Sequence, residues 1–228
     1  RQMCIRDRFY HDMVEIYLGC NCAKGSPNQP TRQLYEIAYD WVSKHFFYIY
    51  PKEVSPTPDY IKERFLELII KEKIDGCIID PFNQMTNDYS QVGGRDDKYL
   101  ETVLGDFDRF ATINQLFFII VAHPKMMHKD SSGNYPCPDV FDLSGGAMWN
   151  NKMYNILVYH RPGHQQDPTS PLCELHTKKI KRQKIVGEKG SIDMEYFRGK
   201  RRFFIDGKDV LTLTVAETLN PEIDDVPF

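Results

Sequence analysis

The sequence predicts an α/β protein with a mostly parallel central sheet and an antiparallel hairpin toward its C-terminal end. Three short apolar runs, at 46–50, 76–80 and 116–122, are separated by two amphipathic helical patterns. A helix that joins two consecutive strands of one sheet brings those strands parallel. The last two runs are continuous rather than alternating, as is typical of strands covered on both faces.

Two helices are predicted between these strands. "SPTPDYIKERFLELIIKEK" predicts a helix that is capped by Thr57 and opened by Pro58. The second helix is predicted over 96–114. The apolar face of the first helix consists of Ile61, Phe65, Leu68 and Ile69, and that of the second of Leu100, Val103, Leu104, Phe107, Phe110 and Ala111.

The C-terminal half changes character. Residues 124–142 are too long and polar for a tight connection, and loops of this kind are functional or disordered. A short helix is predicted within 143–153 and a strand within 154–160. Two further strands, "SIDMEYF" and "RRFFIDG", flank the turn residues "RGK" and predict a hairpin.

Composition excludes few functions. The 29 basic and 32 acidic residues leave a net charge of −3, which favours neither nucleic acid nor its absence. Six scattered cysteines, no signal peptide and no long apolar run predict a reducing, cytoplasmic setting without a membrane span. Cys20 and Cys22, with His11 nearby, lack a second ligand pair, so zinc is not expected.

Polar side chains end both central strands. Asp80 follows the apolar run of "CIIDPFNQ", and His123 ends the next apolar run. Ligands of parallel sheets bind at this edge, where a carboxylate can hold Mg²⁺ through water and an imidazole can contact a phosphate. Alone, either residue also fits an ordinary strand end. Lys125, two residues on, adds a charge suited to phosphate.

Two further features bear on nucleotide binding. The phosphate-binding pattern G-x-x-x-x-G-K-[ST] is absent, and "GCNCAKGS" has its lysine and glycine in the wrong order. The run "KKIKRQKIVGEKG" is predicted as a strand with Lys179 and Lys181 on one face and Arg182 and Lys184 on the other. It fits either a solvated edge that discourages aggregation or an arginine offered to a neighbouring subunit's nucleotide.

The combination of motifs resembles a known family. "CIIDPFNQ", "FFIIVAHPKMM", "DLSGGAMWNNKMYNILVYHRP" and "KKIKRQKIVGEKGSIDMEY" occur in an order and at a spacing similar to those of hexameric replicative DNA helicases of the Twinkle and DnaB class, including phage primase-helicases. The resemblance covers roughly residues 9–208, and "AHPK" followed by "DLSGGA" is its most specific part. It implies a RecA-like P-loop NTPase core.

The resemblance implies roles for individual residues. Asp80 looks like the Walker B aspartate that orients Mg²⁺ for ATP, and Gln84 would lie just beyond it, toward the central channel. His123 looks like the sensor that couples the terminal phosphate to the DNA loops. The DNA-binding positions would be Lys125, Ser144, Gly145 and Gly146, near the phosphates of single-stranded DNA.

The resemblance further implies a trans-acting arginine. Arg182 is the choice for the finger offered to a neighbouring subunit, with Lys181 or Lys184 as the accompanying lysine. Relatives usually show lysine, any residue, arginine and a short run to glycine, so "KRQKIVG" leaves the register ambiguous by two residues. Trp149 is expected in the core rather than stacked on a base.

The resemblance departs from the family at the front. The Walker A strand and loop and the catalytic glutamate would lie upstream of Phe9, and "FYHDMVEIYLG" resembles the helix that follows that glutamate. Residues 1–8, "RQMCIRDR", resemble translated sequencing adapter and are set aside. We therefore expect an N-terminally truncated fragment, with the partial motor domain at 9–208 and an acidic tail at 209–228.

The expected function is that of a fragment of an ATP-dependent replicative helicase. It would act as a homo-oligomeric ring, expected to be a hexamer, on single-stranded DNA, with the chain alone inactive as an ATPase. The tip "DDVPF" resembles the acidic tips by which single-strand-binding proteins dock replication partners. Alternatives are a non-catalytic single-strand-binding or ring-assembly module and a RecA-type recombinase or clock-like ATPase.

Overall fold

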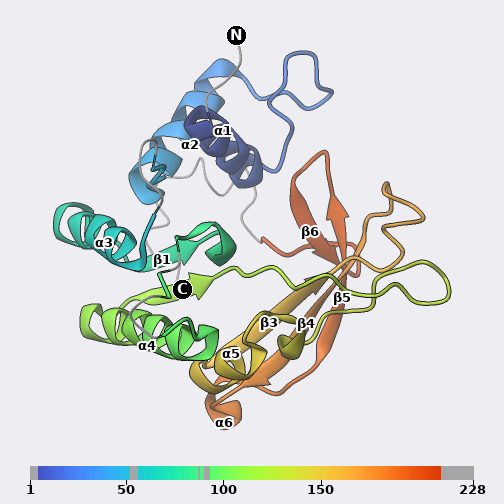
Figure 1. Ribbon diagram of the computed structural model, residues 1–228. Coiled ribbons are helices and arrows are strands. Elements are labelled where there is room, and N and C mark those ends of the chain that lie inside the picture. Colours follow the sequence, from blue (N-terminus) through green and yellow to red (C-terminus); the bar gives the residue numbers. More distant parts are fainter. Residues whose placement is uncertain (1–4, 52–55, 87, 90–92, 212–228) are drawn as a thin grey trace. The chain divides into compact units, whose positions relative to one another are not determined.

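A computed structural model describes residues 5–51, 56–86, 88–89 and 93–211 (Figure 1). The chain divides into two compact units. Unit 1 takes its residues from Arg1–Tyr50, Thr169–Cys173 and Asp193–Phe228, and unit 2 from Pro51–Pro168 and Glu174–Ile192. The tip "DDVPF" and most of the acidic tail lie outside the described residues.

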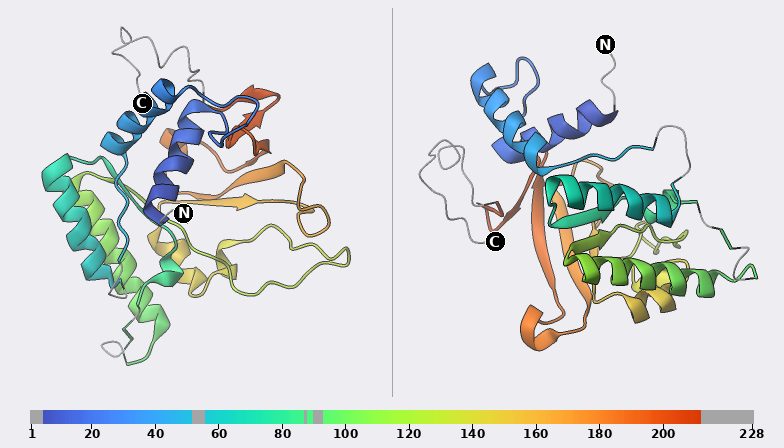
Figure 2. Two further views of the ribbon diagram at one scale, coloured as in Figure 1. Left: turned by 90° about the horizontal axis from the view of Figure 1, so that it is seen from above. Right: turned by 90° about the vertical axis from the view of Figure 1, so that its left-hand side faces the viewer.

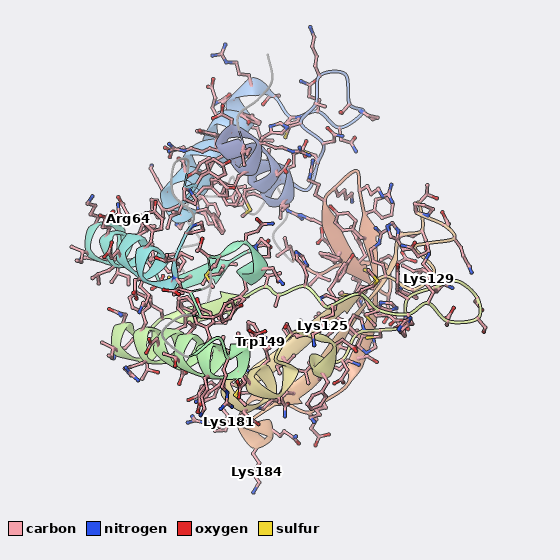
Figure 3. All side chains as sticks on the ribbon, viewed as in Figure 1. Arg64, Lys125, Lys129, Trp149, Lys181 and Lys184 are labelled. Carbon is pink, nitrogen blue, oxygen red and sulfur yellow. The ribbon has the colours of Figure 1, made fainter. Side chains whose placement is uncertain are left out.

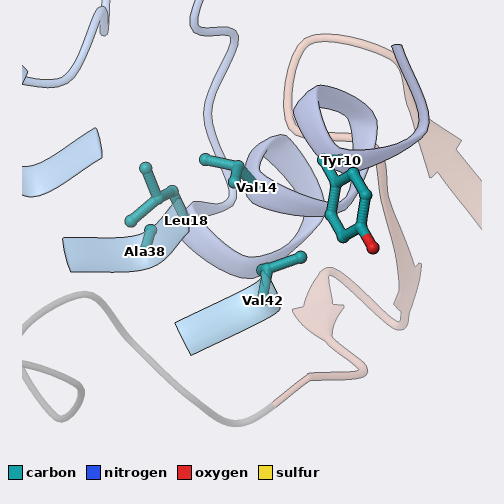
Figure 4. Packing of buried hydrophobic residues seen from close by; sticks show 5 residues of the cluster. All are labelled: Tyr10, Val14, Leu18, Ala38 and Val42. Atoms are coloured by element: carbon teal, nitrogen blue, oxygen red, sulfur yellow. The ribbon is translucent and has the colours of Figure 1, made fainter. Parts of the chain in front are cut away.

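Unit 1 is built on two packed helices, α1 (Ile5–Leu18) and α2 (Arg32–His45). Their shared core consists of Tyr10, Val14, Leu18, Ala38 and Val42, each at most 6% exposed (Figure 4). Spacings of three and four residues place these side chains on one stripe of each helix. Helix α1 begins at Ile5, inside the segment 1–8 that the sequence argument sets aside.

The strand predicted at 46–50 is wrong, because these described residues form no strand ladder. Phe46 instead caps α2 by donating its N–H to the Val42 carbonyl, and its own carbonyl accepts the Tyr10 hydroxyl at 3.0 Å. Tyr48 stacks on Phe9 with ring centroids 4.8 Å apart. An apolar run becomes a strand only where a neighbouring strand pairs with it, and here its side chains cover the helices instead.

Unit 1 also contains the predicted hairpin. Strand β5 (Ser191–Phe197), of which Asp193 onward lies in this unit, pairs antiparallel with β6 (Arg202–Ile205). Strand β6 pairs in turn with β7 (Lys208–Asp209). The hairpin turn spans Arg198 to Arg201. The prediction of two strands around "RGK" is thus confirmed.

Unit 2 begins with the helix and strand order that the sequence predicts. Helix α3 (Pro58–Glu72) is capped by Thr57, whose side chain accepts the Tyr60 N–H. Helix α4 (Asp96–Asn114) has the predicted bounds. The strands β1 (Gly76–Ile79) and β2 (Phe117–Ile120) pair in parallel, as the crossover rule predicts.

The two helices lie side by side, as both views of Figure 2 show. They cover one face of the β1–β2 pair, where Phe118 lies 5.9 Å from the Phe65 ring and 5.3 Å from the Phe107 ring. Leu104 and Phe107 of α4 are almost fully buried. This packing fixes the direction of both strands and therefore the place where they end.

The rest of unit 2 continues from β2 into a long loop. The single-turn helix η1 (Phe82–Gln84) follows β1, while η3 (Val140–Asp142) and α5 (Gly146–Lys152) follow the loop. Strand β3 (Asn155–His160) pairs antiparallel with β4 (Leu172–Ile180), which leads into α6 (Gln183–Val186). Among the described strands, parallel pairing occurs only between β1 and β2, so the parallel part is smaller than the sequence predicts.

Candidate nucleotide and nucleic-acid site

The carboxyl ends of β1 and β2 lie next to each other in unit 2. Ile79 pairs with Ile120, and the Val121 N–H donates to the Ile79 carbonyl at 2.9 Å. Beyond the strands the chains remain paired, because the Phe82 N–H donates to the Val121 carbonyl at 2.8 Å. Asp80 and His123 therefore follow neighbouring strand ends, and both are exposed. This is the arrangement that the sequence predicts.

Asn83, which the sequence argument did not single out, joins these two strand ends. Its side-chain oxygen accepts the backbone N–H of His123 at 3.0 Å. Asn83 sits on η1, whose Phe82 is buried and thereby holds the turn in place. The signal was present in "CIIDPFNQ", because an asparagine just beyond a strand end commonly bonds a nearby backbone group.

A cavity of about 140 Å³ lies at this end of unit 2. It brings His123 together with Ser144, two residues that the sequence assigns to phosphate sensing and DNA binding. Asp80 does not line it. The remaining lining residues are Phe82, Asn83, Tyr89, Asp96, Leu100, Ala122, Leu143 and Trp149.

The two glycines after Ser144 have a packing reason. Gly145 has φ of 68°, and a Cβ on it would collide with Leu100 of α4. A Cβ on Gly146 would lie 2.5 Å from the Val140 carbonyl oxygen. Both glycines therefore let α5 approach its neighbours closely. Gly146 is buried, so Ser144 is the exposed residue of the three.

Trp149 belongs to the core, as predicted. It is 5% exposed and packs edge-to-face on Phe82 with ring centroids 5.0 Å apart. Its indole N–H donates to the Ser144 carbonyl at 3.1 Å. This bond holds the Ser144 backbone against the cavity wall, so Trp149 positions the segment rather than stacking on a base.

The loop between His123 and η3 closes on itself at Lys125. The Lys125 N–H donates to the Asp142 carbonyl at 2.8 Å, and the Lys125 side chain is exposed (Figure 3). A second cavity of about 360 Å³ opens inside this loop. It is lined by Lys125, Met126, Met127, His128, Pro136, Cys137, Phe141 and Asp142.

The predicted strand through the basic run is wrong beyond Ile180. Strand β4 ends there because its partner β3 begins at Asn155, which pairs with Ile180. One more bond, from the Lys181 N–H to the Tyr154 carbonyl at 2.9 Å, completes the ladder. Arg182 then begins the single helical turn α6. The predicted alternation of Lys181, Arg182 and Lys184 therefore does not exist.

The three basic candidates differ in their surroundings. The Lys181 ammonium lies 4.2 Å from the centroid of the Tyr154 ring, a cation–π contact. Arg182 and Lys184 are exposed, and among the described residues neither has an ion-pair partner. Lys184 projects outward in Figure 3. Burial lowers the pKa of nearby Lys179, which bonds the Asn150 carbonyl.

Arg182 and Asp80 are not brought together within one chain. Figure 1 shows α6 well apart from the end of β1, although both belong to unit 2. A finger at Arg182 acting on a nucleotide at Asp80 therefore requires two copies of the chain.

The donor groups suit a magnesium–nucleotide complex better than a metal bound by protein alone. The described residues contain no group of three or more His, Cys, Asp or Glu side chains that could hold a metal ion. Mg²⁺ in nucleotide sites commonly uses one or two carboxylates, waters and substrate phosphates. The exposed carboxylate of Asp80 at a strand end fits that donor set.

The thiols of the described residues are poor nucleophiles. Burial raises the pKa of Cys77 to about 12, and burial together with the Cys20 and Glu15 charges raises that of Cys22 to about 12. Such thiols stay protonated near neutral pH. Thiol chemistry is therefore not expected at either position.

Comparisons with known proteins agree with this architecture. The structure is similar to a solved ATPase domain, with a TM-score of 0.66 and 13% identity, over 90% of this chain and 72% of that one. It is also similar to a DnaB-like replicative helicase, described with its interactions with primase, with a TM-score of 0.62 and 14% identity over 89% of this chain and 48% of that one. No family model matches the sequence.

The fold is thus that of the RecA-like ATPase domains of replicative helicases. The sequence is 27% identical over 160 residues to the Twinkle homologue of chloroplasts and mitochondria from Arabidopsis thaliana. That match spans 69% of this chain and 22% of the plant protein's length. Fold and sequence together make the chain a RecA-like core of the replicative-helicase kind. None of the described helices is long and apolar enough to cross a membrane.

Proposed function

We propose that this chain is part of an ATP-driven motor that moves along single-stranded DNA as a homo-oligomeric ring and unwinds duplex ahead of it. The observation that carries the proposal is the hydrogen bond between the Asn83 side chain and the His123 backbone, which joins the end of β1 to that of β2. Asp80 precedes this bond, and the loop 125–142 follows it. A change at the strand ends is thereby passed directly to the loop.

In this proposal Asp80 holds the waters of the magnesium ion that accompanies ATP. When bound, Mg²⁺ neutralises charge that develops on the transferred phosphoryl group. The His123 side chain faces the cavity that Ser144 also lines, so it can respond to a phosphate at one side and shift the DNA-contacting segment at the other. Lys125 and Ser144 contact DNA phosphates, which carry no sequence information.

Ring assembly follows from the separation of Arg182 and Asp80. An arginine that stabilises a transferring phosphoryl group must come close to it, and within one chain α6 is too far from β1. A neighbouring copy supplies the arginine. We propose Arg182 for this role, with Lys181 held against Tyr154 and Lys184 free to reach the same nucleotide.

We further propose that the 228-residue chain alone hydrolyses ATP poorly. A triphosphate is normally held by a glycine-rich loop and its lysine, and the sequence contains no G-x-x-x-x-G-K-[ST]. The decisive observation is the reading frame upstream of Arg1. An intact loop of this type there supports the motor, whereas its absence favours a single-strand-binding or ring-assembly module.

The activity test uses the protein expressed with that upstream reading frame. Unwinding of a forked duplex, lost in Asp80→Ala and in His123→Ala, is the expected result. Strand exchange without unwinding would favour a recombinase and sink the helicase proposal. Pro124→Ala, next to His123 but without a polar side chain, serves as the control and is expected to keep most of the activity.

A further inference from the structure

An aromatic and a thioether side chain lie exposed at the larger cavity of unit 2. Phe141 is 63% exposed and Met126 is 97% exposed, and both line the cavity of about 360 Å³. Large apolar side chains clustered at the surface commonly mark a binding site. Neither residue was singled out by the sequence argument.

Phe141 is held outward by rigid local structure. It lies on η3, where Asp139 and Asp142 form a reciprocal capping box. The Asp139 N–H donates to the Asp142 carboxylate at 2.7 Å, and the Phe141 N–H donates to the Asp139 carboxylate at 3.3 Å. The preceding residue, Val140, is 5% exposed and anchors the turn in the core. The Phe141 ring is therefore preorganised at the surface rather than loosely placed.

The charges around the cavity suit a phosphate chain. The ammonium of Lys125 makes no ion pair with any described residue, and His128 lies on the same wall. The Asp142 carboxylate also lines the wall, but it accepts a backbone N–H in the capping box. Lys125 is thus the charge in this cavity that no local bond occupies.

We propose that this cavity receives one unstacked base of single-stranded DNA, which stacks on Phe141 beside Met126 while Lys125 binds an adjacent phosphate. Every base has a π-face, so such a contact tolerates any sequence. The inference rests on the proposed DNA-binding function and adds to it a contact to a base, where the loop otherwise contacts only phosphates.

The test compares two oligonucleotides that differ only in their bases. The 228-residue chain is titrated at low salt with a fluorescent oligothymidylate of about 12 nucleotides, a length within common single-strand site sizes. The second oligonucleotide has the same phosphates but a run of abasic sites. We expect the chain to bind oligothymidylate about 5- to 100-fold more tightly than the abasic strand.

Three substitutions assign the difference. Phe141→Ala is expected to remove most of it, and Phe141→Trp to keep it. Lys125→Ala is expected to weaken both oligonucleotides alike and to make binding less dependent on salt. Phe117→Ala is the matched control, because Phe117 is 69% exposed in the same unit but does not line the cavity.

Each outcome decides the matter. Equal binding of both strands, or unchanged binding by Phe141→Ala, overturns the base contact while leaving DNA binding in place. No binding of either strand overturns the base contact and the proposed function together. A change in self-association of Phe141→Ala without a change in DNA binding makes the patch a protein contact and also overturns the inference. Should Phe141→Ala unfold, Met126→Ala replaces it, because a side chain that is 97% exposed has little packing to lose.

Discussion

The two units use their charged residues in opposite ways. In unit 1, Glu15 and Arg202 are 3% and 6% exposed, respectively. The Arg202 guanidinium donates to the Ile16 carbonyl at 2.8 Å, the Tyr17 carbonyl at 2.6 Å and the Asp209 carboxylate at 2.8 Å. In unit 2, the candidate residues Asp80, His123, Lys125 and Arg182 are all exposed.

This difference separates charges that hold the fold from charges that are available to a ligand. Glu15 accepts the Cys22 N–H at 2.9 Å and pairs with Arg201, so its oxygens are occupied. A buried charge that loses its partners is costly, which makes such a cluster structural. Exposed charges contribute little to stability, so their place at strand ends and loop tips is better explained by binding.

The largest expected effect concerns an exposed charge. Arg182→Ala, in the protein expressed with its upstream reading frame, is expected to lower kcat for ATP by about 1,000-fold or more while leaving nucleotide affinity nearly unchanged. The reason is that a finger acts on the transition state. Steady-state ATPase assays and equilibrium nucleotide binding measure the two quantities.

Arg109→Ala is the control for this experiment, because Arg109 is an exposed arginine of α4 that pairs only with Asp106 among the described residues. Its kcat should stay close to that of the wild type. Normal turnover in Arg182→Ala would reject the assignment, and Lys181→Ala and Lys184→Ala would then be measured in turn.

The buried charge gives the second effect. Arg202→Met is expected to lower the free energy of unfolding by about 3–5 kcal/mol, because it leaves the Asp209 carboxylate and two backbone carbonyls without their donor. Trp41 belongs to unit 1 and reports on it in urea titrations of a Trp149→Phe background.

The same chemical change at an exposed site provides the comparison. Arg182→Met should alter the free energy of unfolding by no more than about 0.5 kcal/mol. Equal losses from Arg182→Met and Arg202→Met would erase the distinction between the two kinds of charge.

A smaller effect tests the close packing around the candidate site. Gly146→Ala is expected to cost about 1–3 kcal/mol, because its Cβ would lie 2.5 Å from the Val140 carbonyl oxygen and 2.6 Å from the Phe141 Cα. Thermal unfolding measures the loss. Gly105→Ala, inside α4 with no atom within 4 Å of its Cβ, should instead gain about 0.5–1 kcal/mol. A loss in both variants would mean that helix interiors, not the packing at α5, set the cost.

The smallest effect concerns the bond between the strand ends. Asn83→Leu removes the acceptor of the His123 N–H, and the bond is expected to contribute about 0.5–1.5 kcal/mol. Exchange of the His123 amide hydrogen should become about 2- to 10-fold faster, as measured by NMR. Asn83→Asp keeps an oxygen in place and should exchange like the wild type. Unchanged exchange in Asn83→Leu would show that the bond does not couple the strands.

Local signals in the sequence predicted much of the fold. Thr57 and Pro58 mark the start of α3, and the apolar spacing from Leu100 to Phe107 marks α4, because caps and periodicity depend on neighbours in sequence. The apolar run at 46–50 failed as a strand because pairing depends on a partner distant in sequence.

The candidate site was predicted in outline and not in detail. Asp80 and His123 were found because both follow apolar runs, and the structure puts them at adjacent strand ends. Asn83 was missed because its bond spans 40 residues of sequence. The basic run was misread for a similar reason, since the position where β3 begins decides where β4 ends. The roles of these residues stay predictions.

The bond from the Lys125 N–H to the Asp142 carbonyl has a consequence for engineering. It clamps the base of the loop, so the ends of a 16-residue excursion between the two residues stay together whatever lies between them. Closing a longer excursion costs little additional entropy. A fluorescent tag or a grafted peptide inserted after the exposed Ser131 would therefore leave the sheet intact, and the loop would serve as a replaceable module on a fixed scaffold.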